Sequence, residues 1–409
     1  MSCYRIFEMI FCFLSEIINN SKPECFIRIN DNLLEHQPLF LHPTIEKGFI
    51  YPKEVGTNVV VIKSGDSIRL ACPGSHILLN TIKLYENVLF QCSEDYLFSF
   101  IGENIKMSIY QIVCDEHPRH AARKTSRSCE IGIIGEIGFF ITNNKNEEFY
   151  KIIDFCHNEQ WSHTVYAHTQ IPAVINAAAR NVPYPGFVKG EFFQGIAISK
   201  IYTKRNQREV LGVILNNKSL AHHYIQSTGS YYLARGHLIA KRDLIYAAQQ
   251  RATFYYVNVV PMWQSINNGN WKKIEISIRN YASHKKCNLE VWAGTLEVLQ
   301  LEDTYGNPQK INLFHQNHED QTIPVPKILF KVVYDKISRA GIVFLTANNP
   351  YLEKFLENDY IICENVCEKI NYIALDKRYD RGYSYCCSIN DFRRSFKYLP
   401  YFRTDKLLI

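Results

Sequence analysis

Apolar residues along the chain occur in short runs that are interrupted by Gly, Pro and Asn. In the N-terminal part, examples are Asn58–Lys63, Ser67–Cys72 and Ile131–Ile141. Short apolar or alternating runs between turn-forming residues are typical of β-strands. The pattern therefore predicts a smaller, β-rich N-terminal domain over residues 25–145.

The pattern changes towards mixed structure in the rest of the chain. A segment between Tyr231 and Lys286 has the spacing of a strand–helix–strand–helix unit. Apolar or β-like runs precede and follow it, at Phe192–Tyr202, Gln207–Leu215, Leu289–Leu301, Lys327–Val333 and Gly341–Leu345. Strands and helices mixed in this way indicate an α+β domain, which we place over residues 146–409.

Four elements are predicted within the strand–helix–strand–helix segment. Tyr231–Ala234 is strand-like, Asp243 starts a short helix, and Thr253–Asn258 returns as a strand. A polar loop rich in Asn and Gly then leads into a helix from about Asn270 to Ala282.

The composition is that of a folded globular protein, with 46% hydrophobic and 21% charged residues. A formal charge of +6 over 409 residues permits an anionic partner but does not require one. The basic stretch Glu116–Arg127 is expected to be a solvated loop, with phosphate contact as the less favoured alternative. No run approaches the roughly 18 apolar residues of a membrane span, so we expect no membrane partner.

Thirteen cysteines are scattered along the chain, at positions 3, 12, 25, 72, 92, 114, 129, 156, 287, 363, 367, 386 and 387. No CxxC pair has a matching second pair, which argues against a zinc ribbon. Scattered cysteines at this density favour disulfides in an oxidising compartment over buried reduced thiols. We therefore expect a secreted, extracellular protein.

The N-terminus offers partial support for secretion. Residues 5–14 resemble the short apolar region of a signal peptide, although Glu8 interrupts it, and we take residues 1–24 as a candidate signal peptide. Its removal would take away Cys3 and Cys12. Eleven cysteines would then remain, so at least one would lack an intramolecular partner.

Candidate chemistry begins at the end of the first predicted strand, where Arg235, Gly236 and His237 follow one another. This order places a base beside a cation, and Gly permits close approach of the backbone. Further along, Trp271, Glu275 and Arg279 are spaced by four and share one helix face, with Asn267 at the helix entrance.

Hydrolysis of a phosphodiester needs parts of this kind. A neutral His can activate water, and arginines can bind phosphate in a bidentate manner. A hard cation such as Mg²⁺ prefers oxygen ligands and keeps most of its waters, so one Asn carbonyl with a substrate phosphate can hold it. A lone His is nevertheless more often structural, so these residues alone do not establish a catalytic site.

The order of these motifs resembles that of the DNA/RNA non-specific endonuclease family, which reads D-R-G-H, then N-x-x-P-Q, then L-N-Q-x-x-W-x-x-L-E. The corresponding stretches here are Arg235-Gly236-His237, Asn258-Val259-Val260-Pro261, Ile266-Asn267-Asn268-Gly269-Asn270-Trp271 and Ile274-Glu275. The two motif Asn lie nine residues apart, and the second Asn and the Glu eight apart, with no gap relative to the family.

Several stretches are most similar to the secreted insect members of this family that degrade double-stranded RNA. They are Ala234-Arg235-Gly236-His237-Leu238, Leu70-Ala71-Cys72-Pro73-Gly74 and the C-terminal Tyr385–Phe392. The resemblance thus covers most of the chain. It implies an α+β fold that contains a ββα-metal (His-Me finger) nuclease domain with a central antiparallel sheet, behind the smaller β-rich domain.

The resemblance also implies roles for individual residues. His237 would be the general base, and Asn267 would be the only direct protein ligand of Mg²⁺, for which Mn²⁺ could substitute. Glu275 would orient water in the second shell of the metal. Arg235 and Arg279 would contact the scissile phosphate or stabilise the charge of its transition state.

Two further residues are expected to act in support. Asn258 would brace the site, and Trp271 is expected to be a core residue rather than a platform for base stacking. The chain departs from the family pattern at Ala234, which replaces an Asp, and at Met262, which replaces a Gln. The second change removes a polar side chain close to the predicted site.

The sequence therefore predicts a secreted, Mg²⁺-dependent, sugar-non-specific endonuclease whose partners are RNA, including double-stranded RNA, and DNA. The alternative is a nucleic-acid-binding protein on a nuclease scaffold with little or no turnover, which Met262 and the basic net charge motivate. A structural or toxin-like β protein with a vestigial motif is the least favoured hypothesis. A homodimer is compatible with the sequence, which does not define the oligomeric state.

Overall fold

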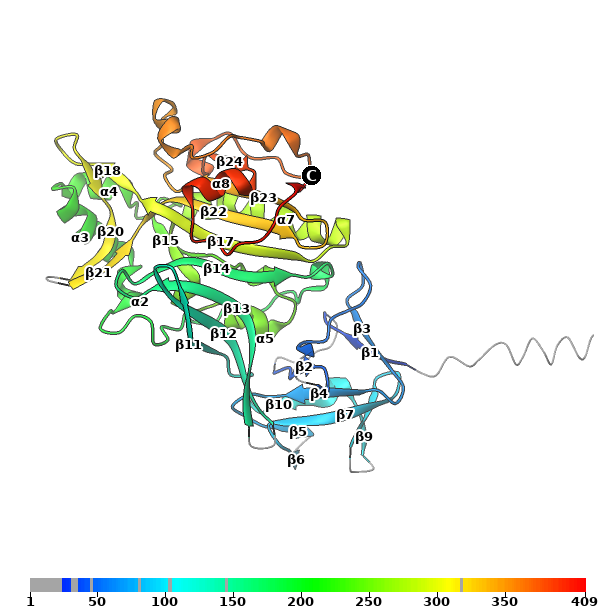
Figure 1. Cartoon of the computed structure of the whole chain (residues 1–409). Coiled ribbons are helices and arrows are strands. Elements are labelled where there is room, and N and C mark those ends of the chain that lie inside the picture. Colours follow the sequence, from blue (N-terminus) through cyan, green and yellow to red (C-terminus); the bar gives the residue numbers. More distant parts are fainter. Residues whose placement is uncertain are drawn as a thin grey trace, which may run out of the picture. The chain divides into compact units, whose positions relative to one another are not determined.

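The computed structural model of the chain describes residues 24–30, 36–44, 47–79, 82–101, 105–143, 146–316 and 319–409. The candidate signal peptide up to residue 23, with Cys3 and Cys12, lies outside the described residues. The chain forms two compact units (Figure 1). The first unit comprises Met1–Lys53, Asn58–Arg119 and Ile141–Glu148, and the second comprises Glu54–Thr57, His120–Phe140 and Phe149–Ile409.

The chain passes between the two units more than once. Residues 120–140 belong to the second unit, whereas residues 141–148 return to the first. The division into independently folding domains at residue 145 stays a prediction.

The first unit consists of short strands, as the apolar runs predict. Its largest sheet has the order β2(Leu39–Leu41)–β4(Ser67–Ala71)–β7(Asn87–Glu94)–β8(Leu97–Phe100)–β9(Lys106–Ser108). Two smaller sheets are β1(Glu24–Arg28)–β3(Val59–Lys63) and β10(Ile112–Cys114)–β5(Ile77–Leu79)–β6(Ile82–Lys83).

Alternating burial and two disulfides hold the first unit together. In β7 the side chains of Val88, Phe90 and Cys92 are buried while those between them are more exposed. The bond Cys25–Cys92 joins β1 to β7, and Cys72–Cys114 joins the end of β4 to β10. Cross-links of this kind compensate for the small core of a short β unit.

The second unit is organised around a large sheet that is antiparallel except at its last pair. Its order is β11(Ala121–Cys129)–β12(Gly132–Asn143)–β13(Asn146–Asn158)–β14(His163–Ile171)–β17(Leu289–Val298)–β22(Pro326–Asp335)–β23(Ala340–Ala347)–β24(Ser384–Cys387), with β25(Lys406–Leu407) parallel to β23. Two hairpins, β18(Gln300–Glu302)–β19(Pro308–Lys310) and β20(Asn312–Gln316)–β21(Glu319–Pro324), extend from it. The predicted central antiparallel sheet is confirmed.

The prediction of a basic loop at residues 116–127 is wrong, because most of this stretch belongs to strand β11. Arg123 and Arg127 each form an ion pair with the nearly buried Glu136 of β12, with N–O distances of 2.8 Å. Cross-strand pairs of opposite charge stabilise neighbouring strands, so these cations serve the sheet.

Helices occupy the segments between the strands. They are α2(Ile198–Ile201), α3(Lys204–Ile214), α4(Lys218–Tyr224), α5(Ala247–Ala252), α6(Gln264–Ile266), α7(Lys272–Lys285) and α8(Ile389–Ser395). The apolar run at 207–215 is thus helical, and Thr203 caps its helix by accepting a hydrogen bond from the Asn206 N–H. No helix in the described part of the chain is long and apolar enough to cross a membrane.

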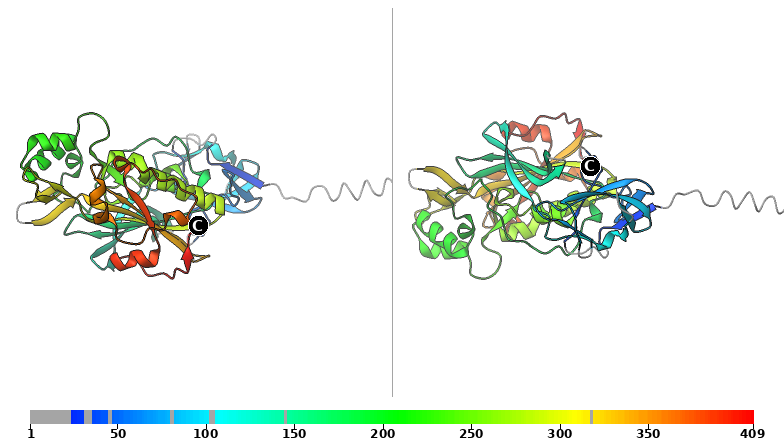
Figure 2. Two further views of the ribbon diagram at one scale, coloured as in Figure 1. Left: turned by 90° about the horizontal axis from the view of Figure 1, so that it is seen from above. Right: turned by 90° about the horizontal axis from the view of Figure 1, so that it is seen from below.

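Helices α7 and α8 lie on opposite faces of the large sheet (Figure 2). Neighbouring residues of β22 reflect this division, because successive side chains of a strand point to opposite faces. Phe330 packs against Phe392 of α8, with ring centroids 5.1 Å apart, whereas the Lys331 ammonium lies 5.0 Å from the Trp271 ring centroid, on the other face.

The face that carries α7 also carries a β-hairpin. Strands β15(Leu233–His237) and β16(Val259–Trp263) pair antiparallel and are followed by α6 and α7, which gives the order ββα. Asn348, at the end of β23, donates hydrogen bonds to the carbonyls of Pro261 and Pro326 and accepts one from the Trp263 N–H. These bonds tie the hairpin to the large sheet.

Three predicted elements of this segment differ from the structure. The strand predicted at Tyr231–Ala234 is β15, which starts at Leu233 and includes Arg235 and His237. The helix expected from Asp243 begins only at Ala247, because the Asp243 carboxylate accepts a bond from the Ala240 N–H and closes a separate 3-10 turn. Thr253–Asn258 is not a strand, since Asn258 lies in a 3-10 turn and its N–H bonds to the Tyr255 carbonyl. The strand of this region, β16, starts at Val259, directly after Asn258.

Three disulfides stabilise the second unit, namely Cys129–Cys156, Cys363–Cys387 and Cys367–Cys386. Of the eleven cysteines in the described ranges, Cys287 alone is free. The expectation that at least one of these eleven lacks an intramolecular partner is confirmed.

Candidate active site

Strand alternation in the β15–β16 hairpin separates the candidate catalytic residues from Met262. Arg235 and His237 are two residues apart and share one face, while Gly236 and Met262 occupy the other. The Met262 side chain is fully buried, and a Cβ on Gly236 would lie 2.5 Å from the Cβ of Met262. Gly236 is therefore required for this packing, and the Met262 side chain does not reach the face of His237.

The imidazole of His237 is packed between aromatic rings. Phe254 lies edge-on at 4.9 Å between ring centroids, and Phe187 lies at 5.5 Å. The Nε2 atom of His237 is buried and has no hydrogen-bond partner among the described residues. Burial, together with the positive charge of Lys331, lowers the pKa of His237 to about 4, so the ring is neutral near pH 7.

Asn258 fixes the backbone that follows His237. Its side-chain amide donates to the carbonyls of Ile239 and Thr253, and its carbonyl oxygen accepts from the Ile239 N–H, all at 3.0 Å. Its main-chain carbonyl accepts from the Leu238 N–H. Because its side chain is fully buried and hydrogen-bonded, Asn258 can support His237 but cannot touch a substrate.

Two buried side chains hold the same backbone from the other side. Trp271 Nε1 donates to the His237 carbonyl at 3.3 Å, and Lys331 Nζ donates to the Leu238 carbonyl at 2.7 Å. Both residues are fully buried, so Trp271 is a core residue, as expected.

Asp243 connects the buried cations of the site. Its carboxylate lies 2.6 Å from Arg279 Nη1 and 3.9 Å from Lys331 Nζ. The Arg279 and Asp243 side chains are only 15% and 2% exposed, so this ion pair is little screened by solvent. Arg279 therefore reaches the site already paired with a carboxylate.

Glu275 lies in the same electrostatic environment. Burial raises the pKa of its carboxyl, and Asp243 adds to the rise, while Lys331 and Arg279 oppose it. A raised pKa means that the surroundings disfavour the negative charge. A cation close to Glu275 would reverse that preference.

Arg235 extends the site towards helix α2. Its Nε donates to the Tyr256 hydroxyl at 3.1 Å, and Nη2 donates to the Ser199 carbonyl at 3.2 Å. Its guanidinium also packs against the rings of Tyr202 and Phe187, at 5.1 and 5.4 Å. These contacts set its orientation, and a guanidinium has five N–H groups, so donors remain for a phosphate.

Asn267 begins a wide, π-type turn, Asn267–Trp271, between α6 and α7. Within it, Gly269 has a non-helical backbone, with φ −92° and ψ −126°. A Cβ at Gly269 would lie 2.4 Å from the Arg381 carbonyl oxygen, so only glycine allows this close approach.

Asn270 anchors the same turn to the C-terminal region. It is fully buried, and its amide donates to the carbonyls of Asp376 and Gly382 at 2.9 and 2.7 Å. Its side-chain oxygen accepts from the Asp376 N–H at 2.8 Å. Three hydrogen bonds thus hold the residues next to Asn267 in place.

One open cavity of about 650 Å³ brings most of the predicted site residues together. Those that line it are Arg235, His237, Asn267, Glu275 and Arg279, whereas Asn258 lies behind it. Three cations that the motif did not reveal also line it, namely Lys241, Arg242 and Lys272. A wall with one carboxylate and five cationic side chains suits a polyanionic ligand.

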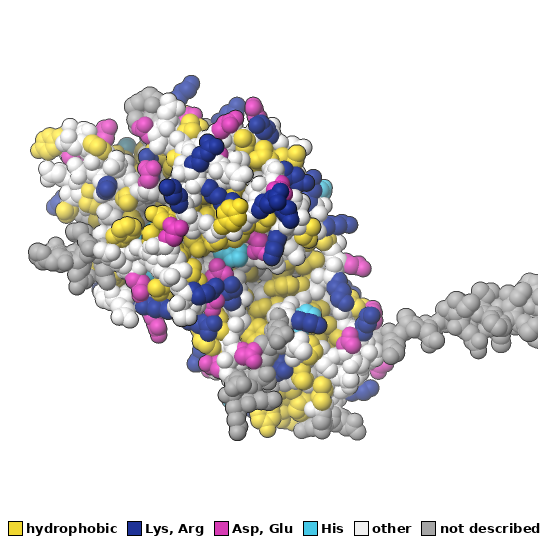
Figure 3. All heavy atoms as spheres, viewed as in Figure 1, with side chains coloured by type: hydrophobic (Ala, Val, Ile, Leu, Met, Phe, Trp, Pro, Cys, Tyr) yellow, Lys and Arg dark blue, Asp and Glu magenta, His cyan; other side chains and the backbone are white. Residues whose placement is uncertain are grey.

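This concentration of charge is local. On the face of the molecule seen in Figure 3, Lys and Arg side chains are interspersed with Asp and Glu. The cavity is therefore a better guide to ligand chemistry than the net charge of the whole chain.

The donors at the cavity fit a hard divalent cation with few protein ligands. No group of three or more His, Cys, Asp or Glu side chains in the described part of the chain is placed to hold a metal. The oxygen donors that line the cavity include the Glu275 carboxylate and the amides of Asn267, Asn268 and Asn181. Mg²⁺ and Mn²⁺ accept oxygen ligands, and Mg²⁺ keeps several of its waters.

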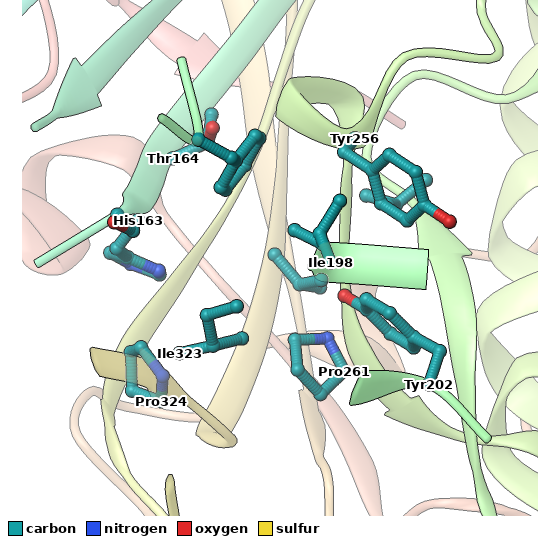
Figure 4. A pocket seen from close by; sticks show the side chains of 12 residues that line it. His163, Thr164, Ile198, Tyr202, Tyr256, Pro261, Ile323 and Pro324 are labelled. Carbon is teal, nitrogen blue, oxygen red and sulfur yellow. The ribbon is translucent and has the colours of Figure 1, made fainter. Parts of the chain in front are cut away.

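A second cavity, of about 10 Å³, lies behind Tyr256 and Tyr202 and has room for about one water molecule (Figure 4). Its lining combines apolar residues with uncharged polar ones such as Ser162 and Thr164, and none of its lining residues is acidic, Lys or Arg. Burial lowers the pKa of its His163 to about 4, so that residue is neutral near pH 7. This cavity lacks the charge that a phosphate site requires.

The motif assigned no role to several residues of the site. Asp243, Lys331 and Asn270 act through buried contacts, and Lys331 is 93 residues from the Leu238 carbonyl that it binds. Asp243 does lie within the recognised segment, where an acidic residue six positions after a candidate base is a weak signal.

Comparison with known proteins places this ββα site in a family. Residues 133–392 match the DNA/RNA non-specific endonuclease family, which is more than half of the chain, and the protein belongs to that family. The ββα element of the fold, β15–β16–α7, carries the motif residues.

Its relatives include insect salivary proteins. The salivary protein Tsal1 of Glossina morsitans morsitans is 24% identical over 94% of this chain and 93% of its own length. A salivary endonuclease of Lutzomyia longipalpis is 24% identical over 91% of this chain and 83% of its own length. One chain of a crystal structure of the EndoG/EndoGI complex aligns with 51% of this chain and 74% of its own, at 15% identity and a TM-score of 0.34, which defines neither fold nor function.

Proposed function

We propose that this protein is a secreted, Mg²⁺-dependent endonuclease that hydrolyses phosphodiester bonds of RNA, including double-stranded RNA, and of DNA. The observation that carries the proposal is the neutral imidazole of His237 at a cavity that Asn267 and five cationic side chains also line. Family membership supports the nuclease activity. The five disulfides and the salivary relatives support secretion.

The protein groups would act as follows. His237, neutral at physiological pH because burial lowers its pKa, accepts a proton on its imidazole ring from the attacking water. Arg235 presents its free N–H groups to the scissile phosphate, and Arg279 contributes charge that Asp243 partly offsets. Asn258 keeps His237 in position through the bonds at residues 238 and 239.

Asn267 and Glu275 would hold the metal, with Asn267 as the direct ligand and Glu275 in the second shell. Bound there, Mg²⁺ or Mn²⁺ would stabilise the charge that develops on the phosphoryl oxygens and the leaving group. Asn270 and Gly269 would preserve the turn that places Asn267. The groups that would contact the substrate or the metal act on the phosphate, which RNA and DNA share. The proposed activity therefore does not depend on the sugar.

Cleavage by the full chain, with and without EDTA, tests the proposal. Double-stranded RNA, single-stranded RNA and DNA should all be cut in Mg²⁺, and EDTA should abolish cleavage. His237→Ala should lower kcat by roughly 10²- to 10⁴-fold, the usual contribution of a general base. His222→Ala, an exposed His on α4, is the matched control and should leave the rate unchanged.

Two results would overturn parts of the proposal. Full activity in His237→Ala would reject the assignment of the base. Salt-sensitive binding of nucleic acid by the unmodified protein, with no cleavage in Mg²⁺ or Mn²⁺, would establish the alternative of a binding protein on a nuclease scaffold.

A further inference from the structure

Tyr184 is an exposed aromatic residue at the edge of the candidate active site. It lies in the segment between the 3-10 turn Ile175–Ala177 and helix α2, and it lines the same cavity as His237. It is 81% exposed, so its ring is open to solvent. Nothing in the motif points to this residue.

The other aromatic residues at the cavity are not available in the same way. Phe254 is only 3% exposed. Phe187 packs against the rings of His237, Phe254 and Tyr256, at centroid distances of 5.0 to 5.5 Å. Tyr184 is therefore the aromatic residue of this wall whose ring can receive a ligand.

Lys241 places a positive charge beside the Tyr184 ring. Its ammonium lies 4.1 Å from the ring centroid and donates a hydrogen bond to the Val182 carbonyl, two residues before Tyr184. An ammonium has three N–H donors, so this bond leaves others free for an anion. The two contacts also fix the position of the Tyr184 segment relative to Lys241.

Tyr184 lies close to the proposed general base. The Phe254 ring is in contact with both residues, with its centroid 5.8 Å from that of Tyr184 and 4.9 Å from that of His237. A ligand group on Tyr184 would thus be near a phosphate that reacts at His237. A nucleotide offers the matching parts, which are a flat base and an anionic phosphate.

We propose that Tyr184 and Lys241 form a nucleotide subsite in which Tyr184 stacks on an unpaired base next to the scissile phosphate and Lys241 binds the phosphate of that nucleotide. The inference rests on the proposed nuclease function and deepens it by naming a class of substrate. Stacking on an aromatic ring tolerates every base, because each has a π-face, and it adds no sequence preference.

The subsite distinguishes single strands from duplexes. In a duplex the faces of each base are covered by its neighbours, and exposing one requires unstacking, which is costly. A single strand or a frayed end can place a base on Tyr184 without that penalty. Duplexes would be held through phosphate contacts alone, so single-stranded segments should bind more tightly per phosphate.

Binding and cleavage by the full chain test this subsite. Binding of a labelled single-stranded oligonucleotide, an abasic oligonucleotide of equal length and a blunt duplex is measured by fluorescence anisotropy in the His237→Ala background with EDTA. Tyr184→Ala should weaken binding of the single strand by about 5- to 100-fold, as expected for the loss of one stacked base. Binding of the abasic strand and of the duplex should change less than about 3-fold, which is below the effect of losing one stacked base.

Two variants sharpen the comparison. Tyr184→Trp should retain single-strand binding, because it keeps an aromatic face. Tyr305→Ala removes a similarly exposed Tyr, 76% exposed at the β18–β19 turn, and should bind all three ligands like the parent. In the protein with His237 intact, Tyr184→Ala should raise KM for single-stranded RNA while kcat changes little.

The outcomes separate this inference from the proposed function. Equal weakening on base-bearing and abasic strands, or no weakening on either, overturns the stacking subsite even if the protein cleaves RNA. Selective weakening on base-bearing strands supports the subsite even if the protein with His237 intact shows no cleavage. That absence of cleavage would overturn the nuclease proposal and not the subsite.

Discussion

Met262 stands where the family pattern has a Gln, yet its side chain does not belong to the candidate active site. It is fully buried on the hairpin face opposite His237 and packs against Gly236. The departure from the family pattern therefore changes the packing behind the site rather than the groups that meet a substrate. Met262 is then a weak argument for a protein that binds nucleic acid without cutting it.

Met262→Gln should accordingly destabilise the protein without increasing cleavage. A buried amide with no partner costs about 1–3 kcal/mol. We expect the free energy of unfolding to fall by that amount, measured with denaturant and Trp fluorescence, while kcat/KM stays equal or decreases. Met262→Leu, which nearly conserves volume, is the control and should cost less than about 1.5 kcal/mol. A gain in cleavage with Gln would show that position 262 acts on the site.

Lys331 is the buried cation on which the placement of His237 depends. It donates to the Leu238 carbonyl, approaches Asp243 and lies over the Trp271 ring. It also contributes to the lowered pKa of His237. A general base acts in its neutral form, so cleavage falls as the pH drops through that pKa.

Lys331→Met should therefore affect both the rate and its pH dependence. Loss of one member of a buried charged pair destabilises by about 3–5 kcal/mol. Displacement of His237 should lower kcat on the order of 10- to 100-fold. The acidic limb of the pH–rate profile should move to higher pH, because the pKa of His237 rises when the nearby positive charge is removed.

Lys327→Met provides a control on the same face of strand β22. Lys327 pairs with the half-exposed Glu297 and should contribute at most about 1 kcal/mol. If Lys331→Met slows cleavage but leaves the acidic limb in place, its role is structural only and the electrostatic part of the argument is wrong.

Among the elements, the Asn267–Trp271 turn has the greatest influence on the proposed metal site. Asn270 holds it with three hydrogen bonds to Asp376 and Gly382, and Gly269 allows the close approach to Arg381. Loss of a residue that orients a metal ligand through hydrogen bonds typically lowers the metal affinity by about 10- to 100-fold.

Asn270→Ala should raise the Mg²⁺ concentration needed for half-maximal cleavage by about 10- to 100-fold, because Asn267 loses its fixed position. Titration of the initial rate with Mg²⁺ measures this effect. Asn280→Ala, on the exposed side of α7, is the control and should leave the titration unchanged. An unchanged Mg²⁺ requirement in a folded Asn270→Ala protein would contradict the role of this turn.

The elements also show which parts of the fold the sequence could predict. Strands such as β3 and β4 were predictable because their pattern and turn residues are local. The end of α7 was close to its prediction, and Lys286, with φ 52°, ends the helix in the left-handed conformation. The turns at Asp243 and Asn258 were missed because side chains of both bind backbone groups and override the local pattern.

The candidate site also contains residues that the sequence predicts and residues that it does not. The motif gathers His237, Arg235, Asn267, Glu275 and Arg279, and the structure places all of them at one cavity. Lys331 was not predictable because the large sheet brings it to the site from a distant part of the sequence. Tyr184 was not predictable because its segment, between the 3-10 turn Ile175–Ala177 and α2, has no recognisable sequence pattern. A motif shows what is shared with a family, whereas these contacts depend on packing in three dimensions.

At the scale of the whole molecule, a charged cluster links three strands of the large sheet. His168 of β14 lies between Asp154 of β13 and Glu290 of β17, with N–O distances of 3.3 and 2.9 Å, and it stacks on Trp292. The side chains of the three charged residues are at most 20% exposed. Although burial opposes it, hydrogen bonding to the two carboxylates raises the pKa of His168, and the pKa values of Asp154 and Glu290 are lowered.

These shifts define the pH range in which the cluster stabilises the fold. A raised His pKa gives stability that is complete below the unfolded value of about 6.5 and is lost as pH rises through the folded value. Lowered carboxyl pKa values give stability that is present above about 4 and is lost below it. The cluster is therefore most stabilising between about pH 4.5 and 6.5, and it weakens above that range.

Other buried histidines have the opposite effect, so the comparison must be made between variants. Burial lowers the pKa of His157 to about 3 and that of His163 to about 4, and these residues reduce stability as the pH falls below about 6.5. The difference in unfolding free energy between the parent and His168→Gln isolates the cluster. All four Trp residues, at 161, 263, 271 and 292, lie in the second unit, so Trp fluorescence in denaturant reports its unfolding.

We expect that difference to be largest near pH 5.5 and to shrink steadily as the pH rises past 6.5. Trp292 should also respond to the change, because His168 stacks on its ring at 4.4 Å. His222→Gln, on the exposed surface of α4, should follow the parent at every pH. A difference that is constant from pH 5 to 9 would mean that His168 contributes packing alone, because a neutral ring would make the same contacts throughout that range.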